Sequence, residues 1–201
     1  MKQGVYLIGA FHEMVEMLES LGVPILGLID QCEATDICCS QYPLLGDDQW
    51  LLHKGVQEGR QDVVITPDNP RLRKRLTQQY ATAGFGTPSF VAGEVSKYAK
   101  IGQGAIIQKF AYISAASQLG RGVKVNVGAK VMHDVRIGDY VTIAPSAVIL
   151  GKVTIESEVY IGANATVLPN IHIGRGATIG AGSVVTKNVA DNSVVIGVPA
   201  K

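Results

Sequence analysis

The residues best suited to chemistry in this chain are His133 and the acidic residue that follows it, Asp134. An imidazole is the side chain best matched to proton transfer near neutral pH. An adjacent carboxylate can raise its basicity or fix its tautomer. By residue chemistry alone, a catalytic base and a plain surface histidine remain equally good readings of His133. The other histidine of this half, His172, is expected to be a solvated surface residue.

These residues lie in a stretch with a strict six-residue period. Every sixth residue from Val95 to Val185 is Val, Ile or Leu, at sixteen positions without a gap. The position four residues further on is always small or β-branched. Period six fits neither a helix nor a simple strand, and it is the signature of a parallel β-helix of hexapeptide repeats.

In such a coil three hexapeptides form one triangular turn, and the large aliphatic residue fills the interior. Sixteen repeats give about five stacked coils. Glycine often follows the aliphatic residue, and we expect it there to relieve the corner backbone. It occurs at Gly102, Gly120, Gly138, Gly162, Gly174 and Gly180. A β-helix is a scaffold, so function must come from residues on its outside.

The first half of the chain has a different pattern, in which short apolar runs alternate with helical segments. Strands are predicted at 5–8, 25–29 and 63–65, and helices at 13–21 and 71–80. Gly22 is predicted to end the first helix, and Pro70 to lie in the first turn of the second. Strand, helix and strand in short units predict a parallel, Rossmann-like βαβ layout in a small domain.

Composition excludes several classes of function. Lys and Arg total 18 and Asp and Glu total 17, which argues against electrostatic capture of nucleic acid or acidic membrane. No signal peptide and no stretch of transmembrane length is seen, so we expect a cytoplasmic protein without membrane insertion. Cys32, Cys38 and Cys39 are odd in number and close together, so a disulfide framework is not expected and a reducing compartment is.

The chain resembles a family over nearly its whole length. The stretch from Asn126 through "VGAKVMHDVRIGDYVTIAPSAVILGKVTI" to "GVPAK", with "YLIGA" and "YPLLGDD" in the first half, resembles bacterial sugar acetyltransferases. These are sialic-acid O-acetyltransferases and the N-acetyltransferases of bacillosamine and perosamine pathways. The resemblance implies a substrate-binding domain over 1–88 and a left-handed β-helix acyltransferase domain over 89–201. It also implies a homotrimer, acetyl-CoA as co-substrate in the groove between neighbouring prisms, no metal, and a nucleotide-activated amino sugar as acceptor.

The resemblance also assigns site residues. It makes His133 the general base and Asp134 its acidic partner. The positions that match donor contacts are Thr142, Gly151, Ala163 and Ala181, with Gly151 as a backbone donor to the thioester oxygen. The positions that match acceptor contacts are Gly9, Ala10, Asp30 and Asn126.

Two family motifs are altered here. The glycine-rich loop "GAGGHG" reads "GAFHE" from Gly9 to Glu13, and the later "GDN" turn reads "TPDN" from Thr66 to Asn69. Two readings therefore stay open: a nucleotide sugar bound in an altered pose, or an acceptor without a nucleotide. His12 is a candidate contact or a surface residue. The basic helix residues Arg71, Arg73, Lys74 and Arg75 fit a solvated face better than a phosphate site.

Other functions remain as alternatives. O-acetylation of a sugar hydroxyl is the nearest. A structural or regulatory trimer that has lost nucleotide-sugar binding is the non-catalytic one. A zinc enzyme of the γ-type carbonic anhydrase kind needs three converging histidines, and only two lie in the repeats.

Overall fold

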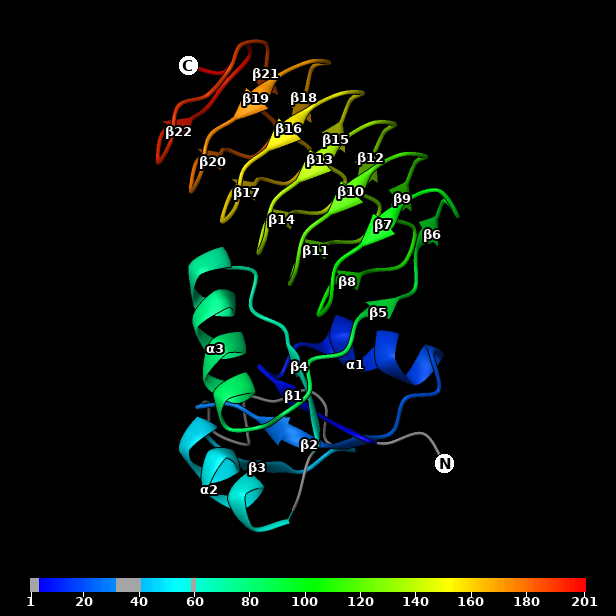
Figure 1. Cartoon of the computed structure of the whole chain (residues 1–201), viewed down its shortest axis with the longest axis vertical. Helices are drawn as coiled ribbons and strands as arrows, with labels where there is room; N and C mark the ends of the chain where they lie inside the picture. The colour runs from blue at the N-terminus through cyan, green and yellow to red at the C-terminus, as the bar shows by residue number, and fades with distance from the viewer. Residues whose placement is uncertain (1–3, 32–40, 59–60) are drawn as a thin grey trace. The chain divides into compact units, whose positions relative to one another are not determined.

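The computed structural model describes residues 4–31, 41–58 and 61–201 (Figure 1). The chain divides into two compact units, one of residues 1–67 and 72–88, the other of residues 68–71 and 89–201. Cys32, Cys38 and Cys39 lie outside the described residues, so their expected role stays a prediction. Within the described ranges, no helix is long and apolar enough to cross a membrane.

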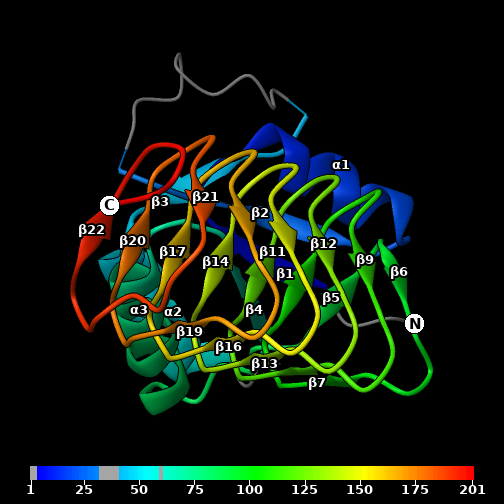
Figure 2. The ribbon, with the colours of Figure 1, turned by 90° about the horizontal axis from the view of Figure 1, so that it is seen from above.

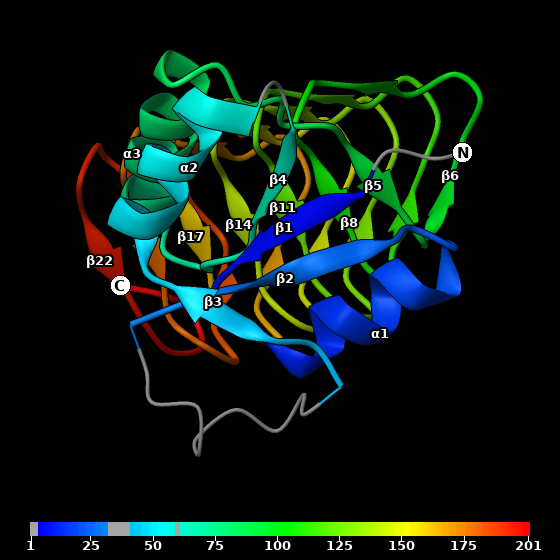
Figure 3. The ribbon, with the colours of Figure 1, turned by 90° about the horizontal axis from the view of Figure 1, so that it is seen from below.

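The first unit is built on a four-stranded parallel sheet (Figure 3). Its strands are β1 (Val5–Ile8), β2 (Ile25–Ile29), β3 (Leu44–Gly46) and β4 (Asp62–Ile65), in the order β3-β2-β1-β4. The helices are α1 (His12–Ser20), α2 (Asp48–Glu58) and α3 (Pro70–Thr82), the last of which begins in the segment grouped with the second unit. All neighbouring strands are parallel, so their carboxyl ends meet at one edge of the sheet.

The predicted strands and helices of this unit are confirmed, but two elements were missed. Gly22, with φ 62°, ends α1 as expected and donates its N–H to the Glu19 carbonyl. The missed elements are β3 and α2. β3 has three residues, all half-buried, so it is too short to show a period. The described part of α2 buries Leu51 fully, while its neighbours are half-buried or exposed.

The second unit is a stack of triangular coils with two-residue strands (Figure 2). Three parallel sheets form its sides. The five-stranded sheet holds β7 (Lys100–Ile101), β10 (Gln118–Leu119), β13 (Arg136–Ile137), β16 (Thr154–Ile155) and β19 (His172–Ile173). The six-stranded sheet holds β6 (Glu94–Val95), β9 (Tyr112–Ile113), β12 (Lys130–Val131), β15 (Val148–Ile149), β18 (Thr166–Val167) and β21 (Val184–Val185). The seven-stranded sheet holds β5 (Phe90–Val91), β8 (Ile106–Ile107), β11 (Lys124–Val125), β14 (Thr142–Ile143), β17 (Tyr160–Ile161), β20 (Thr178–Ile179) and β22 (Val194–Val195).

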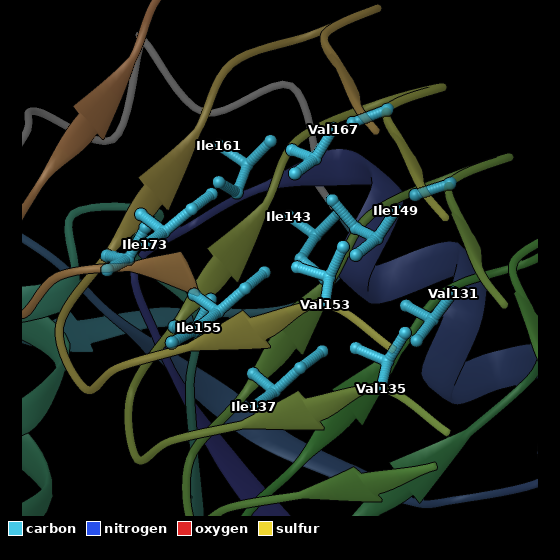
Figure 4. Close-up of a cluster of buried hydrophobic side chains, with 14 of the residues drawn as sticks. Val131, Val135, Ile137, Ile143, Ile149, Val153, Ile155, Ile161, Val167 and Ile173 are labelled. Atoms are coloured by element: carbon cyan, nitrogen blue, oxygen red, sulfur yellow. The ribbon is translucent and has the colours of Figure 1, made fainter. Parts of the chain in front are cut away.

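The six-residue period predicts the core of this unit correctly. The aliphatic residue of each repeat is the second residue of a strand, and it points into the coil (Figure 4). From Ile107 to Val185 these residues are at most 5% exposed, while Val95 and Ile101 in the first coil are half-buried. Gln118 pairs with Arg136, so one coil takes eighteen residues. The hexapeptide repeats and parallel stacked sheets fit a left-handed β-helix.

The expected role of the repeat glycines was wrong in its physical reason. Gly102 and Gly120 do not adopt positive φ. Instead, a Cβ on Gly102 would lie 2.5 Å from the backbone of Gly120 in the next coil, so the glycine permits close stacking. The left-handed backbone falls two residues later, at Gly104, Gly122 and their equivalents, and most coils place a non-glycine residue there.

Candidate active site

His133 lies on a corner of the coil whose backbone is hydrogen-bonded to the coils on both sides. The turns that follow the six-stranded sheet carry His133 after β12 and Gly151 after β15, and we call this column the His133 corner. The Asp134 N–H donates to the Ala115 carbonyl in the preceding coil, and the Lys152 N–H donates to the His133 carbonyl. Both sides of the His133 backbone are therefore fixed by neighbouring coils.

Asp134 turns its carboxylate back onto the imidazole. Its φ of 60° lies in the left-handed region, as the corner requires. His133 Nδ1 lies 2.9 Å from Asp134 Oδ2, and the two side chains are 56% and 51% exposed. A carboxylate on Nδ1 favours the tautomer with the proton on that nitrogen, which leaves Nε2 as the acceptor. The pair has the geometry of a base with an orienting acid.

Gly151 lies directly under the imidazole ring. A Cβ on Gly151 would sit 2.7 Å from His133 Cε1 and 2.8 Å from Nε2, so only glycine leaves the ring where it is. Gly151 is buried, and its N–H has no acceptor among the described residues. A buried, unsatisfied N–H next to a base is what a substrate oxygen would complete.

The other positions expected to contact acetyl-CoA lie on a different corner of the same prism. Ala163 follows β17 and Ala181 follows β20, so both belong to the turns after the seven-stranded sheet, which we call the Ala163 corner. The two are linked, since the Gly182 N–H donates to the Ala163 carbonyl. Within the part of the chain that the structure describes, neither alanine's N–H finds an acceptor.

Thr142 differs from the other positions expected to contact acetyl-CoA, because its hydroxyl already makes a hydrogen bond within the chain. It is fully buried, and its hydroxyl donates to the carbonyl of Asp68 at 2.6 Å. The expected contact of Thr142 with acetyl-CoA stays a prediction. One prism thus brings His133, Asp134 and Gly151 together, but it does not bring them to Ala163 and Ala181.

A polar cluster on the seven-stranded sheet joins Asn126 to Lys124 and Asp68, two residues that the sequence did not single out. Lys124 lies on β11 with its side chain only 2% exposed, and its Nζ is 2.9 Å from Asp68 Oδ1. Asn126, also buried, donates from Nδ2 to the same oxygen at 3.1 Å. Burial, and after it the negative charge of Asp68, raise the pKa of Tyr160 on this face. A lysine at an outward strand position gives no sequence signal that it will be buried.

The predicted acceptor residues of the first unit meet at the carboxyl edge of its sheet. Asp30 follows β2, and its carboxylate accepts hydrogen bonds from the N–H groups of Ala10 and Gln31. Gly9 has φ 90°, and a Cβ there would lie 2.5 Å from Thr66 Oγ1. The carboxyl edge of an open parallel sheet is where such folds bind ligands. Asn126 belongs to the other unit, in the cluster around Asp68.

The basic helix presents the expected solvated face only in part, because Arg71 and Arg75 are exposed but Arg73 is not. Arg73 is 1% exposed and donates to the Pro67 carbonyl, so it serves the interior of the first unit. Arg71 donates to Asn192 Oδ1. His12 is exposed in the first turn of α1, and His172 is exposed on β19. Among the described residues, no group of three or more His, Cys, Asp or Glu is placed to hold a metal.

Comparison with known proteins also finds the hexapeptide repeats. The family model for the bacterial transferase hexapeptide (six repeats) matches residues 116–151 and 152–187. The acetyltransferase domain of PglB from Neisseria gonorrhoeae, solved with acetyl coenzyme A, is 30% identical with a TM-score of 0.89, over 100% of this chain and 99% of that one. No significant match was found among curated proteins.

Two further solved structures cover the chain almost completely. A histidine-to-alanine variant of GDP-perosamine N-acetyltransferase from Caulobacter crescentus, in complex with CoA and GDP-perosamine, is 29% identical with a TM-score of 0.89, over 98% of this chain and 95% of that one. WeeI from Acinetobacter baumannii is 25% identical with a TM-score of 0.86, over 100% and 99%. With these likenesses, its repeats and its fold, the chain belongs to the hexapeptide-repeat acyltransferases, in the group of the bacterial sugar acetyltransferases.

Proposed function

We propose that the protein transfers the acetyl group of acetyl-CoA to the amino group of a nucleotide-linked amino sugar, with His133 as general base. The observation that carries this is the His133–Asp134 pair held against Gly151, whose buried N–H has no acceptor among the described residues. The relatives solved with acetyl-CoA, or with CoA and GDP-perosamine, supply the chemical class of donor and acceptor.

The chemistry follows from these groups. A thioester carbon is already electrophilic, so the acceptor amine needs only to lose a proton as it attacks. His133 Nε2 takes that proton and can return it to the departing CoA sulfur. The Gly151 N–H stabilises the oxyanion that forms on the thioester oxygen, a contact worth about 3–4 kcal/mol in other acyl transfers.

A homotrimer would complete the site. The His133 corner and the Ala163 corner lie apart on one prism, so a donor that touches both must bind between two chains. We take the His133 corner of one protomer to face the Ala163 corner of its neighbour, which puts three equivalent sites around a three-fold axis. The N–H groups of Ala163 and Ala181, which have no acceptor among the described residues, then line the groove for acetyl-CoA.

The first unit is taken to be a Rossmann-like domain that holds the nucleotide part of the acceptor. Support comes from the parallel sheet and from Gly9, Ala10 and Asp30 at its carboxyl edge. Both carboxylate oxygens of Asp30 already accept hydrogen bonds from backbone N–H groups, which fixes this loop. A ligand that binds Asp30 must therefore share these oxygens with the backbone.

The test is thiol release from acetyl-CoA with a panel of nucleotide-linked amino sugars and plain sugars. Wild-type protein should acetylate an amino sugar, and His133→Ala should lower kcat by about 100- to 10,000-fold. The unfolding temperature should stay unchanged, because the ring is 56% exposed and carries no core packing. Unchanged kcat in His133→Ala would refute the assignment, and transfer only to hydroxyl acceptors would make the protein an O-acetyltransferase.

A further inference from the structure

The charged cluster on the seven-stranded sheet is costly and has no evident role in the coil. Burying an ammonium group is unfavourable unless a carboxylate and hydrogen bonds compensate for it. Lys124 is nonetheless 2% exposed, although the equivalent outward position one coil earlier, Ile106, is apolar and buried. The prism therefore tolerates an apolar residue there, and the lysine needs a reason beyond packing.

The cluster converges on one carboxylate that is itself open to solvent. Lys124 and Asn126 are buried and both reach Oδ1 of Asp68, yet the Asp68 side chain is 46% exposed. Thr142 holds the backbone of Asp68 through its carbonyl. Lys124 and Asn126 thus hold one oxygen of a carboxylate whose side chain is half exposed.

We propose that Asp68 is an acceptor-binding residue whose carboxylate accepts hydrogen bonds from the amino and hydroxyl groups of the acceptor sugar. Lys124 and Asn126 are positioning residues that act through it. The inference rests on the proposed function, because it takes the acceptor to be an amino sugar.

The negative charge of Asp68 favours the acceptor sugar over CoA as the ligand that it binds. CoA carries several phosphates, which a carboxylate repels, whereas an amino sugar offers an ammonium group and hydroxyl donors. Position agrees with this choice. Asn126 directly precedes the Ala163 corner, and it is 3.1 Å from Asp68 Oδ1. An acceptor held by Asp68 would therefore lie beside the groove proposed for the donor.

A purely structural anchor is the competing explanation, and it predicts different effects. Asp68→Asn keeps the shape, an oxygen for Lys124 and Asn126, and the backbone bond from Thr142. The hydrogen-bond geometry of the anchor therefore survives this change, while the negative charge that faces both Lys124 and the ligand is lost. Asp139→Asn is the matched control, because Asp139 also pairs with a cation, Arg121, but on the corner after the five-stranded sheet.

The experiment measures acceptor binding by calorimetry on the full chain with CoA present. The probes are GDP-perosamine and a panel of UDP- and dTDP-linked amino sugars. We expect Asp68→Asn to raise the acceptor Kd about 10- to 100-fold, as loss of hydrogen bonds to a charged group does. The CoA Kd should stay as in wild type. The unfolding temperature should fall, because the buried Lys124 loses its carboxylate partner. Asp139→Asn should change the Kd of neither ligand.

A double-mutant cycle tests the positioning role. Lys124→Met should raise the acceptor Kd in wild type but add nothing in the Asp68→Asn background. An unchanged acceptor Kd in Asp68→Asn, an equal loss of CoA binding, or no binding of any probe to wild type would overturn the inference. Thiol release on the same samples separates the two claims. Acceptor binding without turnover would refute the transferase function and leave the role of Asp68 standing.

Discussion

The His133 ring lies against Gly151, and a glycine has no side chain that would displace the ring. Its carboxylate partner is the next residue in the chain, and the left-handed backbone of the corner aims Asp134 back at Nδ1. The sequence shows the pair and the resemblance names Gly151, but neither shows that this glycine lies under the ring. That contact exists only because one coil takes eighteen residues.

Gly151→Ala should impair catalysis more than stability. The new methyl group would lie within 3 Å of two ring atoms, so the imidazole must move. A displacement of about 1 Å can cost about 100-fold in rate, so we expect kcat to fall between 10- and 100-fold. The unfolding temperature should change little, since the exposed ring can swing outward. Wild-type kcat in this variant would show that the position of the ring is not critical.

At the scale of elements, the coils need glycine for two separate reasons. A Cβ on Gly120 would lie 2.7 Å from the backbone carbon of Gly138, so Gly120→Ala must push two coils apart. Gly182 has φ 67° and nothing within 4 Å of the position of a Cβ, and asparagine tolerates that backbone.

The two substitutions should therefore differ in their cost. We expect Gly120→Ala to lower the free energy of unfolding by about 1–3 kcal/mol, and Gly182→Asn by less than about 1 kcal/mol. Denaturant unfolding of both variants measures the difference. Equal losses would contradict the close-stacking role of Gly120.

In the first unit, one hydrogen bond ties α3 to α2. The hydroxyl of Tyr80 donates to Asp48 Oδ1 at 2.6 Å, and its ring meets Phe85 edge-on. Burial and then Asp48 raise the pKa of Tyr80 far above its ordinary value. The neutral hydroxyl is thus the folded form, and its stabilising effect is fully present below the unfolded pKa near 10 and lost as pH rises toward the folded pKa.

Tyr80→Phe should remove this dependence. We expect a loss of about 1.5–3 kcal/mol in the free energy of unfolding at pH 7. The difference from wild type should shrink above about pH 10, where the unfolded tyrosine ionises. Chemical denaturation of both proteins at each pH measures this difference. A difference in the free energy of unfolding that stays constant across this range would contradict the role of the hydroxyl.

Across the whole molecule, the sequence predicts some parts far better than others. The prism repeats one rule, so the aliphatic positions of its core from Ile107 to Val185 could be read directly. β3 was missed because three half-buried residues carry no period. Arg73 was misjudged and Lys124 was missed because long charged side chains look alike in sequence whether solvated or buried, and only the folded partners decide. The cytoplasmic location stays a prediction.

The most direct test of the shared active site is subunit complementation. His133→Ala disables one corner and Ala181→Arg should block the other, so each variant alone should be nearly inactive. If sites form between protomers, trimers assembled from an equal mixture should regain about a quarter of wild-type activity, since each site needs one intact corner from each of two chains. Thiol release from co-expressed, purified mixed trimers measures this. An inactive mixture would place the whole site within one chain and contradict the account.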